Sequence, residues 1–236
     1  MLIWEIILPK SGFKMHNFQA IIFDLDGVII NSEILWDQCS TELLAQYGHS
    51  YQRSFTKHLC TGKSFVEGTA IIKQYYRIET DLSRLVDQRK AIIRRLYAEK
   101  LAFIKGFPEF INYLQRNRTA LAVATSCDQE LLRIADERLG LSKIFKQHIY
   151  TLDHVNQLSK PNPEIFLYTA RQLLVQPEAA VVIEDSPNGV QAAKNAGMYC
   201  IGLVGTYDKE KLRQADALAD SYQEIVQLLF TGQQDM

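Results

Sequence analysis

Short apolar runs alternate with helical segments through the second half of the chain. The apolar runs cover residues 120–125, 149–150, 179–183 and 199–204. The helical segments cover residues 128–139, a stretch from Pro163 onward, and 187–196. Strands separated by helices of about 10–15 residues are typical of βαβ units. This half therefore predicts a parallel sheet covered by helices.

Residues 32–103 carry a helical pattern and contain no convincing strand. Ser32 can cap a first helix, and residues 64–67 have the spacing of a capping box ahead of a second. Apolar positions over 82–96 recur at the spacing of a third, longer helix. The pattern predicts an all-helical block that precedes most of the sheet.

The stretch IIFDLDGVII at residues 21–30 admits two interpretations. Apolar runs on both sides of an Asp-Gly pair are typical of a tight β-hairpin. The returning arm would be only Val28–Ile30 before the helix at Ser32, which is too short for a strand. We therefore expect one buried strand over 18–24, in the same doubly wound sheet, with the helical block inserted after it.

These patterns predict an α/β chain with two domains and an extension. The core is expected over residues 18–30 and 105–236, the helical domain over 31–104, and an N-terminal extension over 1–17. The start MLIWEIILPK is too short an apolar run to span a membrane or to form a normal signal core. Met15 leaves open whether residues 1–14 belong to the protein.

Composition narrows the partners and the compartment. The chain has 236 residues, 47% of them hydrophobic, and a formal net charge of -1. Such a balance disfavours nucleic acid or an anionic membrane as the main partner, so a small ligand is expected. The four cysteines are too far apart for a C-x-x-C motif, and no secretory signal precedes them. The cytoplasm is the expected compartment, and a monomer the default state.

Polar residues follow three of the predicted strands, and another lies in the connection before Pro161. They are Asp24 and Asp26, Thr125 and Ser126, Lys160, and Glu184 and Asp185. In doubly wound sheets ligands bind beyond the carboxyl ends of the strands, so these side chains are expected to meet. Up to four crowded carboxylates require a cation, and oxygen ligands beside a phosphate site favour Mg²⁺.

The remaining groups predict an anion site beside the metal. Thr125 supplies a hydroxyl, Lys160 a positive charge, and the helices after Asn162 and Ser186 direct their N-termini to the same edge. Phosphoryl transfer needs this kind of charge stabilisation. Asp24 could then attack phosphorus as a nucleophile. Asp26 could protonate the leaving alcohol and deprotonate the attacking water.

Four stretches together resemble the motifs of the haloacid dehalogenase superfamily of phosphohydrolases. They are DLDGV at 24–28, TS at 125–126, KPNP at 160–163 and EDSPNGVQAA at 184–193. The similarity is to the β-phosphoglucomutase-like branch and extends over about residues 18–205. The resemblance implies a Rossmann-like doubly wound core with an inserted helical cap domain.

The resemblance also implies roles for individual residues. Asp24 would be the nucleophile and Asp26 the general acid and base. Thr125, with the neighbouring Ser126, and Lys160 would bind the phosphate. Mg²⁺ would be held by Asp24, the Asp26 carbonyl and Asp185, with Glu184 assisting.

Within that branch the cap favours a phosphatase over a phosphosugar mutase. Mutase relatives place a His where this chain has Trp36, and a Lys-Gly-x-x-Arg type loop where it has Thr61-Gly-Lys-Ser-Phe65. The expected substrate is a small phosphorylated metabolite, and the mutase stays an alternative. Trp36 and Phe65 can be substrate contacts or simply part of the cap core.

Each of these features, taken alone, also has a purely structural interpretation. Asp-Gly is commonly a turn, Thr125 and Ser126 could cap a helix, and Lys160 could be solvated. A receiver module of two-component signalling also phosphorylates an Asp, but its acidic pair comes first in the chain. Haloacid dehalogenation would use an Asp nucleophile without Mg²⁺. The order of all four motifs favours the phosphatase.

Overall fold

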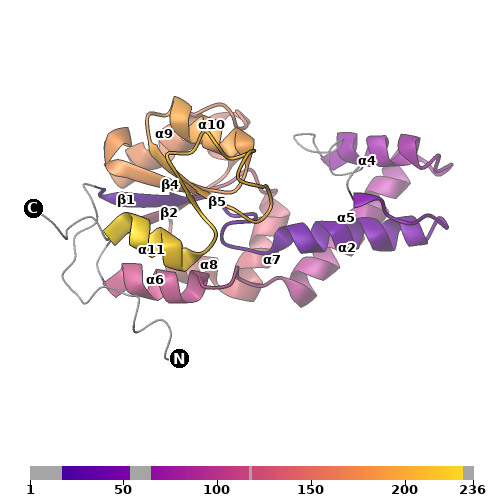
Figure 1. Ribbon diagram of the computed structural model, residues 1–236. Helices are drawn as coiled ribbons and strands as arrows, with labels where there is room; N and C mark the ends of the chain where they lie inside the picture. Colours follow the sequence, from indigo (N-terminus) through magenta and orange to yellow (C-terminus); the bar gives the residue numbers. More distant parts are fainter. Residues whose placement is uncertain (1–17, 54–64, 117–118, 231–236) are drawn as a thin grey trace, which may run out of the picture. The chain divides into compact units, whose positions relative to one another are not determined.

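The computed structural model describes residues 18–53, 65–116 and 119–230. Within them lies one sheet of six strands in the order β3-β2-β1-β4-β5-β6, parallel throughout. The strands are β1 (Ala20–Phe23), β2 (Ala120–Ala124), β3 (Ile149–Tyr150), β4 (Ala180–Glu184), β5 (Tyr199–Leu203) and β6 (Ala217–Ala219). Figure 1 shows the sheet with helices on both of its faces.

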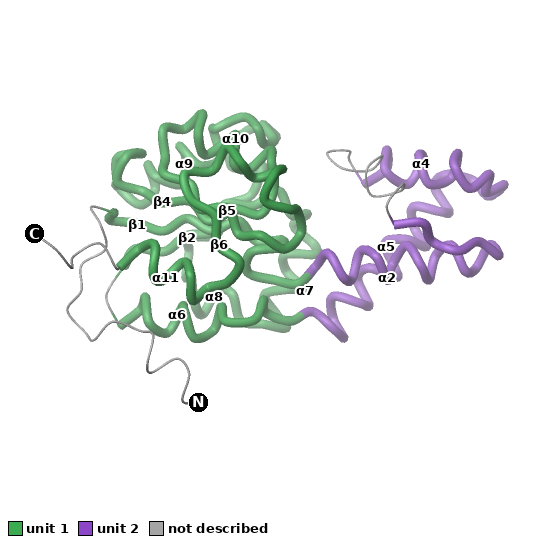
Figure 2. Tube along the Cα trace, viewed as in Figure 1, with its two compact units in different colours: residues 1–31, 102–236 green, residues 32–101 purple. Residues whose placement is uncertain are grey.

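The chain divides into two compact units, residues 1–31 with 102–236 and residues 32–101 (Figure 2). Unit 1 carries the sheet and the helices α6 (Phe107–Arg116), α7 (Gln129–Leu139), α8 (Leu141–Phe145), α9 (Glu164–Leu173), α10 (Pro187–Asn195) and α11 (Tyr222–Phe230). It also has two short 3₁₀ helices, η1 (Leu152–Val155) and η2 (Pro177–Ala179). Unit 2 carries α2 (Ser32–Ala45), α4 (Phe65–Tyr75) and α5 (Leu82–Lys100).

Strand β1 lies at the centre of the sheet. Its four residues are fully buried and pair in parallel register with β2 on one side and β4 on the other. A strand buried on both faces reads as a continuous apolar run, which is why AIIF shows no alternation. The parallel pairing excludes the hairpin. The strand order reverses beside β1, where such sheets bind ligands.

The two faces of the sheet are covered by different helices. Ile22 and Val182 point into a core shared with α9 and α10, which includes Phe166 and Val190. On the other face the Phe23 ring packs within 5.8–6.2 Å of the rings of Phe107, Phe110 and Phe145 from α6 and α8. Alternation along the strand therefore fills both cores.

Unit 2 is held by packing between its long helices. Leu35, Leu43 and Leu44 of α2 and Leu96 and Tyr97 of α5 are buried. The Trp36 ring lies 6.5 Å from the Tyr97 ring and 6.0 Å from the Phe65 ring. The Arg89 guanidinium stacks against Trp36 and Phe65 at 5.5 and 4.8 Å. Trp36 and Phe65 are thus half-buried members of this packing.

The predicted α/β fold is confirmed. Strand bounds agree within one or two residues, and the largest difference is at the start of the predicted strand 18–24, which is shortened to Ala20–Phe23. The helix after the KPNP motif begins at Glu164, with Pro163 at its N-cap and Asn162 Oδ1 accepting from the Glu164 amide at 2.9 Å. Helices α6, α8 and α11 and strand β6 were not predicted.

Several sequence expectations concern residues outside the described part. The extension 1–17, the capping Ser64 and the stretch Thr61–Ser64 all lie there. None of the helices that the structure describes is long and apolar enough to cross a membrane.

Candidate active site

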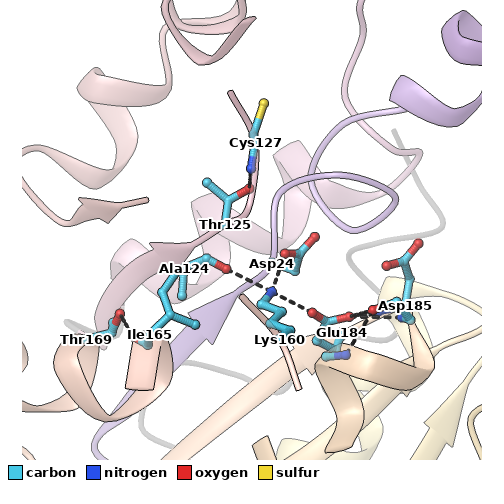
Figure 3. Close-up of polar contacts among 11 residues, drawn as sticks. Asp24, Ala124, Thr125, Cys127, Lys160, Ile165, Thr169, Glu184 and Asp185 are labelled. Atoms are coloured by element: carbon cyan, nitrogen blue, oxygen red, sulfur yellow. Dashed lines mark hydrogen bonds and ion pairs between the residues drawn. The ribbon is translucent and has the colours of Figure 1, made fainter. Parts of the chain in front are cut away.

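Lys160 lies at the centre of a buried polar cluster at the carboxyl ends of β1, β2 and β4. Its Nζ donates to Asp24 Oδ1 at 2.5 Å, to Glu184 Oε1 at 2.7 Å and to the Ala124 carbonyl at 3.1 Å (Figure 3). The Phe166 ring lies 4.8 Å from the same atom. The lysine side chain is 7% exposed, so each of these contacts is shielded from water. Three residues predicted from separate motifs therefore meet directly.

The turn after β1 carries both predicted catalytic acids. Asp24 is buried, and its amide donates to the Ile183 carbonyl at 3.0 Å, which continues the pairing with β4. Gly27 has φ +76°, and a Cβ there would lie 1.8 Å from Asp185 Oδ2 and 2.6 Å from Thr206 Oγ1. Only glycine tolerates this conformation and this approach. Asp185 therefore lies directly against the turn.

Glu184 and Asp185 end β4 and have different surroundings. Glu184 Oε2 accepts from the amides of Asp185 and Ser186 and from the Ser186 hydroxyl, each at 2.9 Å. Its other oxygen accepts from Lys160. Figure 3 shows the carboxylates of Asp24 and Asp185 both pointing beyond the ends of their strands. Both Glu184 oxygens are thus engaged inside the cluster, whereas the Asp185 carboxylate lies against the turn at Gly27.

The TS pair follows β2. Thr125 is fully buried, its amide donates to the Tyr150 carbonyl at 2.9 Å, and its hydroxyl accepts from the Cys127 amide at 2.9 Å. Ser126 is exposed. Cys127 borders the cluster, since burial first, and then Asp26, Asp128 and Asp24, raise the pKa of its thiol well above the usual value. A protonated thiol is a poor nucleophile, so Cys127 does not compete with Asp24 for that role.

The electrostatics of the cluster are dominated by burial. Burial raises the pKa of Asp24 to about 8; the Lys160 ammonium opposes the rise, and Glu184 and Asp26 add to it. Burial alone would lower the pKa of Lys160, but Asp24 and Glu184 raise it above its ordinary value. Lys160 is therefore charged at neutral pH, whereas Asp24 holds a proton for much of the time.

Comparison with known proteins decides the family. Residues 21–203 match the family model described as haloacid dehalogenase-like hydrolase. The chain belongs to this family. The predicted resemblance is thus confirmed, and the four motifs all lie within the matched range.

Two relatives of this hydrolase are phosphatases by name. It is 33% identical to the phosphorylated carbohydrates phosphatase of Thermotoga maritima, over 85% of its own length and 93% of the relative. It is 31% identical to the validoxylamine A 7'-phosphate phosphatase of Streptomyces hygroscopicus subsp. limoneus, over 88% and 96%. This hydrolase is accordingly an enzyme of the phosphatase type.

A solved structure shares the fold of this hydrolase. The crystal structure of a HAD family hydrolase from Deinococcus radiodurans R1 with bound phosphate and sodium superposes with a TM-score of 0.78 at 26% identity. The match covers 90% of this chain and 98% of that one. The likeness therefore extends through both units of the chain.

The donor atoms of the hydrolase suit a hard divalent cation. Within the described residues no three His, Cys, Asp or Glu side chains form a ready metal cluster. A cation that keeps several waters needs only one or two carboxylates, which Asp24 and Asp185 can supply. Asp24 and Asp26 follow β1, and Glu184 and Asp185 end or follow its neighbour β4, at the edge of the sheet where the Lys160 ammonium contacts Asp24 and Glu184. A cation would offset that excess of negative charge and favour the ionised form of Asp24.

Several residues around the cluster carry no recognisable sequence signal. Thr206, in the loop after β5, lies against Gly27 beside Asp185. Phe166 contacts Lys160, and Tyr222 of α11 donates to the Val28 carbonyl. These residues have no motif spacing, and only their surroundings in the folded chain show where they act.

Proposed function

We propose that this hydrolase is a Mg²⁺-dependent phosphatase of a small phosphorylated metabolite, a sugar phosphate or a similar monoester. The observation that carries the proposal is the contact between Asp24 Oδ1 and Lys160 Nζ, 2.5 Å apart at the point where the strand order reverses. A carboxylate beside a buried ammonium can attack an anion that the ammonium attracts. The named relatives support a phosphorylated carbohydrate as the substrate class.

The proposed reaction has two displacements at phosphorus. An Asp24 carboxylate oxygen attacks the phosphoryl group, the bond to the ester oxygen breaks, and Asp26 gives its proton to the departing alcohol. Asp26 then takes a proton from water, which attacks the aspartyl-phosphate and releases inorganic phosphate. Asp24 is regenerated as a carboxylate. Each acid ends the cycle in its starting state.

The other groups bind and orient in this proposal. Lys160, the Thr125 hydroxyl and Ser126 would hold the phosphoryl oxygens. Asp24, the Asp26 carbonyl and Asp185 would hold Mg²⁺, which when bound neutralises charge on the phosphoryl oxygens. Both Glu184 oxygens already accept hydrogen bonds, which supports an indirect role for Glu184: it orients Lys160. Unit 2 is proposed as the cap that selects substrates, and the cytoplasm as the compartment.

A substrate screen tests the proposal. The purified chain is assayed with hexose phosphates, phosphoglycolate, nucleotides and a chromogenic ester, with Mg²⁺ or with a chelator. Asp24→Asn should lower kcat by at least about 10³-fold, as expected for a nucleophile. Asp220→Asn, which changes an exposed acid paired with Lys209, is the matched control. Turnover by Asp24→Asn at the parental rate would refute the assigned nucleophile.

The same screen separates the alternatives. Conversion of a hexose 1-phosphate to its 6-phosphate without release of inorganic phosphate would identify a mutase. Phosphorylation of Asp24 that stops after one equivalent would identify a receiver-like module. A 2-haloacid added to the screen tests the third alternative: release of halide that survives the chelator would identify a dehalogenase.

A further inference from the structure

The backbone turn that follows β1 is closed almost entirely by its own hydrogen bonds. The Leu25 carbonyl accepts from the amides of Ile29 and Ile30 at 2.9 and 3.0 Å. The Gly27 amide donates to the Ile30 carbonyl at 2.9 Å, and the Ile104 amide to the Ile29 carbonyl at 2.8 Å. All of these donors and acceptors are backbone groups, either of the turn itself or of Ile104, which follows the residue that bridges to Ile30.

The Val28 carbonyl is bonded differently. It accepts from the Tyr222 hydroxyl at 2.8 Å, across 194 residues of sequence. Val28 and Tyr222 are both fully buried, so water cannot replace the bond. Val28 follows Asp26 by two residues and Asp24 by four. One side chain from the C-terminal helix α11 thus holds the middle of the turn that carries both acids.

The ring of Tyr222 is itself fixed in place. It lies 5.7 Å from the Phe107 ring and 5.1 Å from the Phe110 ring, both on α6. Those two rings pack on Phe23, the last residue of β1. The hydroxyl therefore reaches the turn from a rigid aromatic cluster that is continuous with the strand below it. A donor held by such packing loses little conformational entropy when it bonds.

We propose that Tyr222 is a positioning residue for phosphoryl transfer, which it supports by fixing the turn at Val28 and thereby the directions of Asp24 and Asp26. This inference rests on the proposed function of those two acids. Removal of the hydroxyl leaves a buried carbonyl without a donor, which the turn can relieve only by moving. A displacement of about 1 Å at a reacting group can cost about 100-fold in rate.

The effect should fall on the chemical step. Lys160, a proposed phosphate binder, contacts Asp24 but is also held by the Ala124 carbonyl and Glu184, and Thr125 is held by the Tyr150 carbonyl and the Cys127 amide, so both keep contacts outside the turn. Substrate affinity should therefore change little, while kcat falls. A purely structural role for the hydroxyl would lower stability without this division between kcat and KM.

The test compares Tyr222→Phe with Tyr113→Phe in the full chain. Tyr113 packs its ring on Phe230, the last residue of α11, 5.1 Å away, whereas Tyr222 is the first. The two ends of α11 are about 12 Å apart at 1.5 Å per residue, so the control removes a buried hydroxyl from the same layer at the far end of the helix. Steady-state kinetics, urea unfolding and amide hydrogen exchange are measured for both.

Two sets of results support the proposal. In Tyr222→Phe, kcat falls about 10-fold or more while KM stays within about 2-fold, and Tyr113→Phe keeps the parental kcat. The amides of Gly27, Ile29 and Ile30 exchange faster by more than the loss of global stability requires, and the Val190 amide of α10 does not.

The opposite results overturn it. One such result is an equal kcat in Tyr222→Phe and Tyr113→Phe. Another is that the turn amides exchange no faster than the change in global stability requires. Either result would show that Tyr222 only packs in the core. If the parent hydrolyses no ester in the screen, the proposed function fails by itself. The exchange measurement then still decides whether Tyr222 holds the turn.

Discussion

Asp24 illustrates at the scale of one residue how burial and charge compete. Burial disfavours its ionised form, whereas the ammonium of Lys160 at 2.5 Å favours it. The negative charges of Glu184 and Asp26 also disfavour the ionised form, and the pKa of Asp24 rises from 3.8 to about 8. A nucleophile must be ionised, so a cation at the site would have a direct chemical benefit. The same burial also costs stability.

Metal-free stability should therefore depend on the charge of Asp24. The folded chain holds the Asp24 proton up to about pH 8 and the unfolded chain only to about pH 4. Because the folded chain binds this proton more tightly, protonation of Asp24 adds to the free energy of unfolding, and this contribution is complete below pH 4. It is lost as the pH rises from 4 through 8, by up to about 1.4 kcal/mol per pH unit. Asp24→Asn lacks this dependence. The unfolding free energy of the variant should therefore rise relative to that of the parent as the pH increases from 5 to 8.

Urea unfolding in a chelator at several pH values measures this difference. Asp220→Asn, at an exposed position, should run parallel to the parent over the same range. A difference between Asp24→Asn and the parent that stays constant with pH would contradict the raised pKa.

Gly189 offers a second prediction at this scale. A glycine inside a helix usually costs about 1 kcal/mol relative to alanine, so Gly189→Ala in α10 would ordinarily stabilise. Here the new Cβ would lie 1.8 Å from Glu184 Oε1. The clash should displace Glu184 from Lys160 and destabilise the fold by about 2–4 kcal/mol, with loss of activity. Gly205→Ala, which meets open space, is the control and should change unfolding by less than about 0.5 kcal/mol.

At the scale of elements, two helices begin beside the site with well-formed caps. Asp128 accepts from the amides of Glu130 and Leu131 at 2.9 and 3.4 Å at the start of α7. Ser186 accepts from the Gly189 amide at 3.1 Å at the start of α10. Only the Ser186 hydroxyl also donates to Glu184. One cap is thus structural, and the other connects α10 with the polar cluster.

Replacement of each cap by alanine should separate these roles. Ser186→Ala and Asp128→Ala should each lower the unfolding free energy by about 1 kcal/mol. Only Ser186→Ala should also reduce kcat, several-fold, because Glu184 loses a donor and holds Lys160 less firmly. Urea unfolding and steady-state kinetics on the same preparations provide the test, and equal kcat in both variants would disprove the connection.

At the scale of the whole molecule, unit 2 leaves and rejoins unit 1 at one place. The Asn31 amide donates to the Ala102 carbonyl at 3.1 Å, and the Ala102 amide donates to Asn31 Oδ1 at 2.9 Å. Both hydrogen bonds belong to unit 1, whose sheet and two cores are complete without residues 32–101. A short linker could therefore replace unit 2.

Replacement of residues 32–101 by a short Gly/Ser linker should leave a chain that unfolds cooperatively. If unit 2 selects substrates, the shortened enzyme should still hydrolyse a chromogenic ester with Mg²⁺. Its kcat/KM values for different sugar phosphates should converge to within about 10-fold, since the contacts that discriminate among them are gone. An unchanged substrate ranking would show that selectivity lies in unit 1.

Much of the core could be predicted because it depends on neighbouring residues. The apolar runs of β1, β2, β4 and β5 and the cap at Ser186 are local patterns, and they place polar residues at strand ends. Strand β6 and helix α11 were missed because Ala217–Ala219 is short and no motif follows it. Tyr222 belongs to no motif, and its partner Val28 lies 194 residues away, so the sequence could not assign this contact.

Periodicity and capping act over a few positions, so the amino-acid order alone establishes which residues stand at the ends of the strands. How those residues divide the contacts depends on the folded chain. Lys160 and Asp24 are 136 residues apart, and no local rule states that Glu184 turns to Lys160 while Asp185 turns to Gly27. Such choices depend on the register of β1 with β4 and on burial, which arise only when the whole sheet assembles.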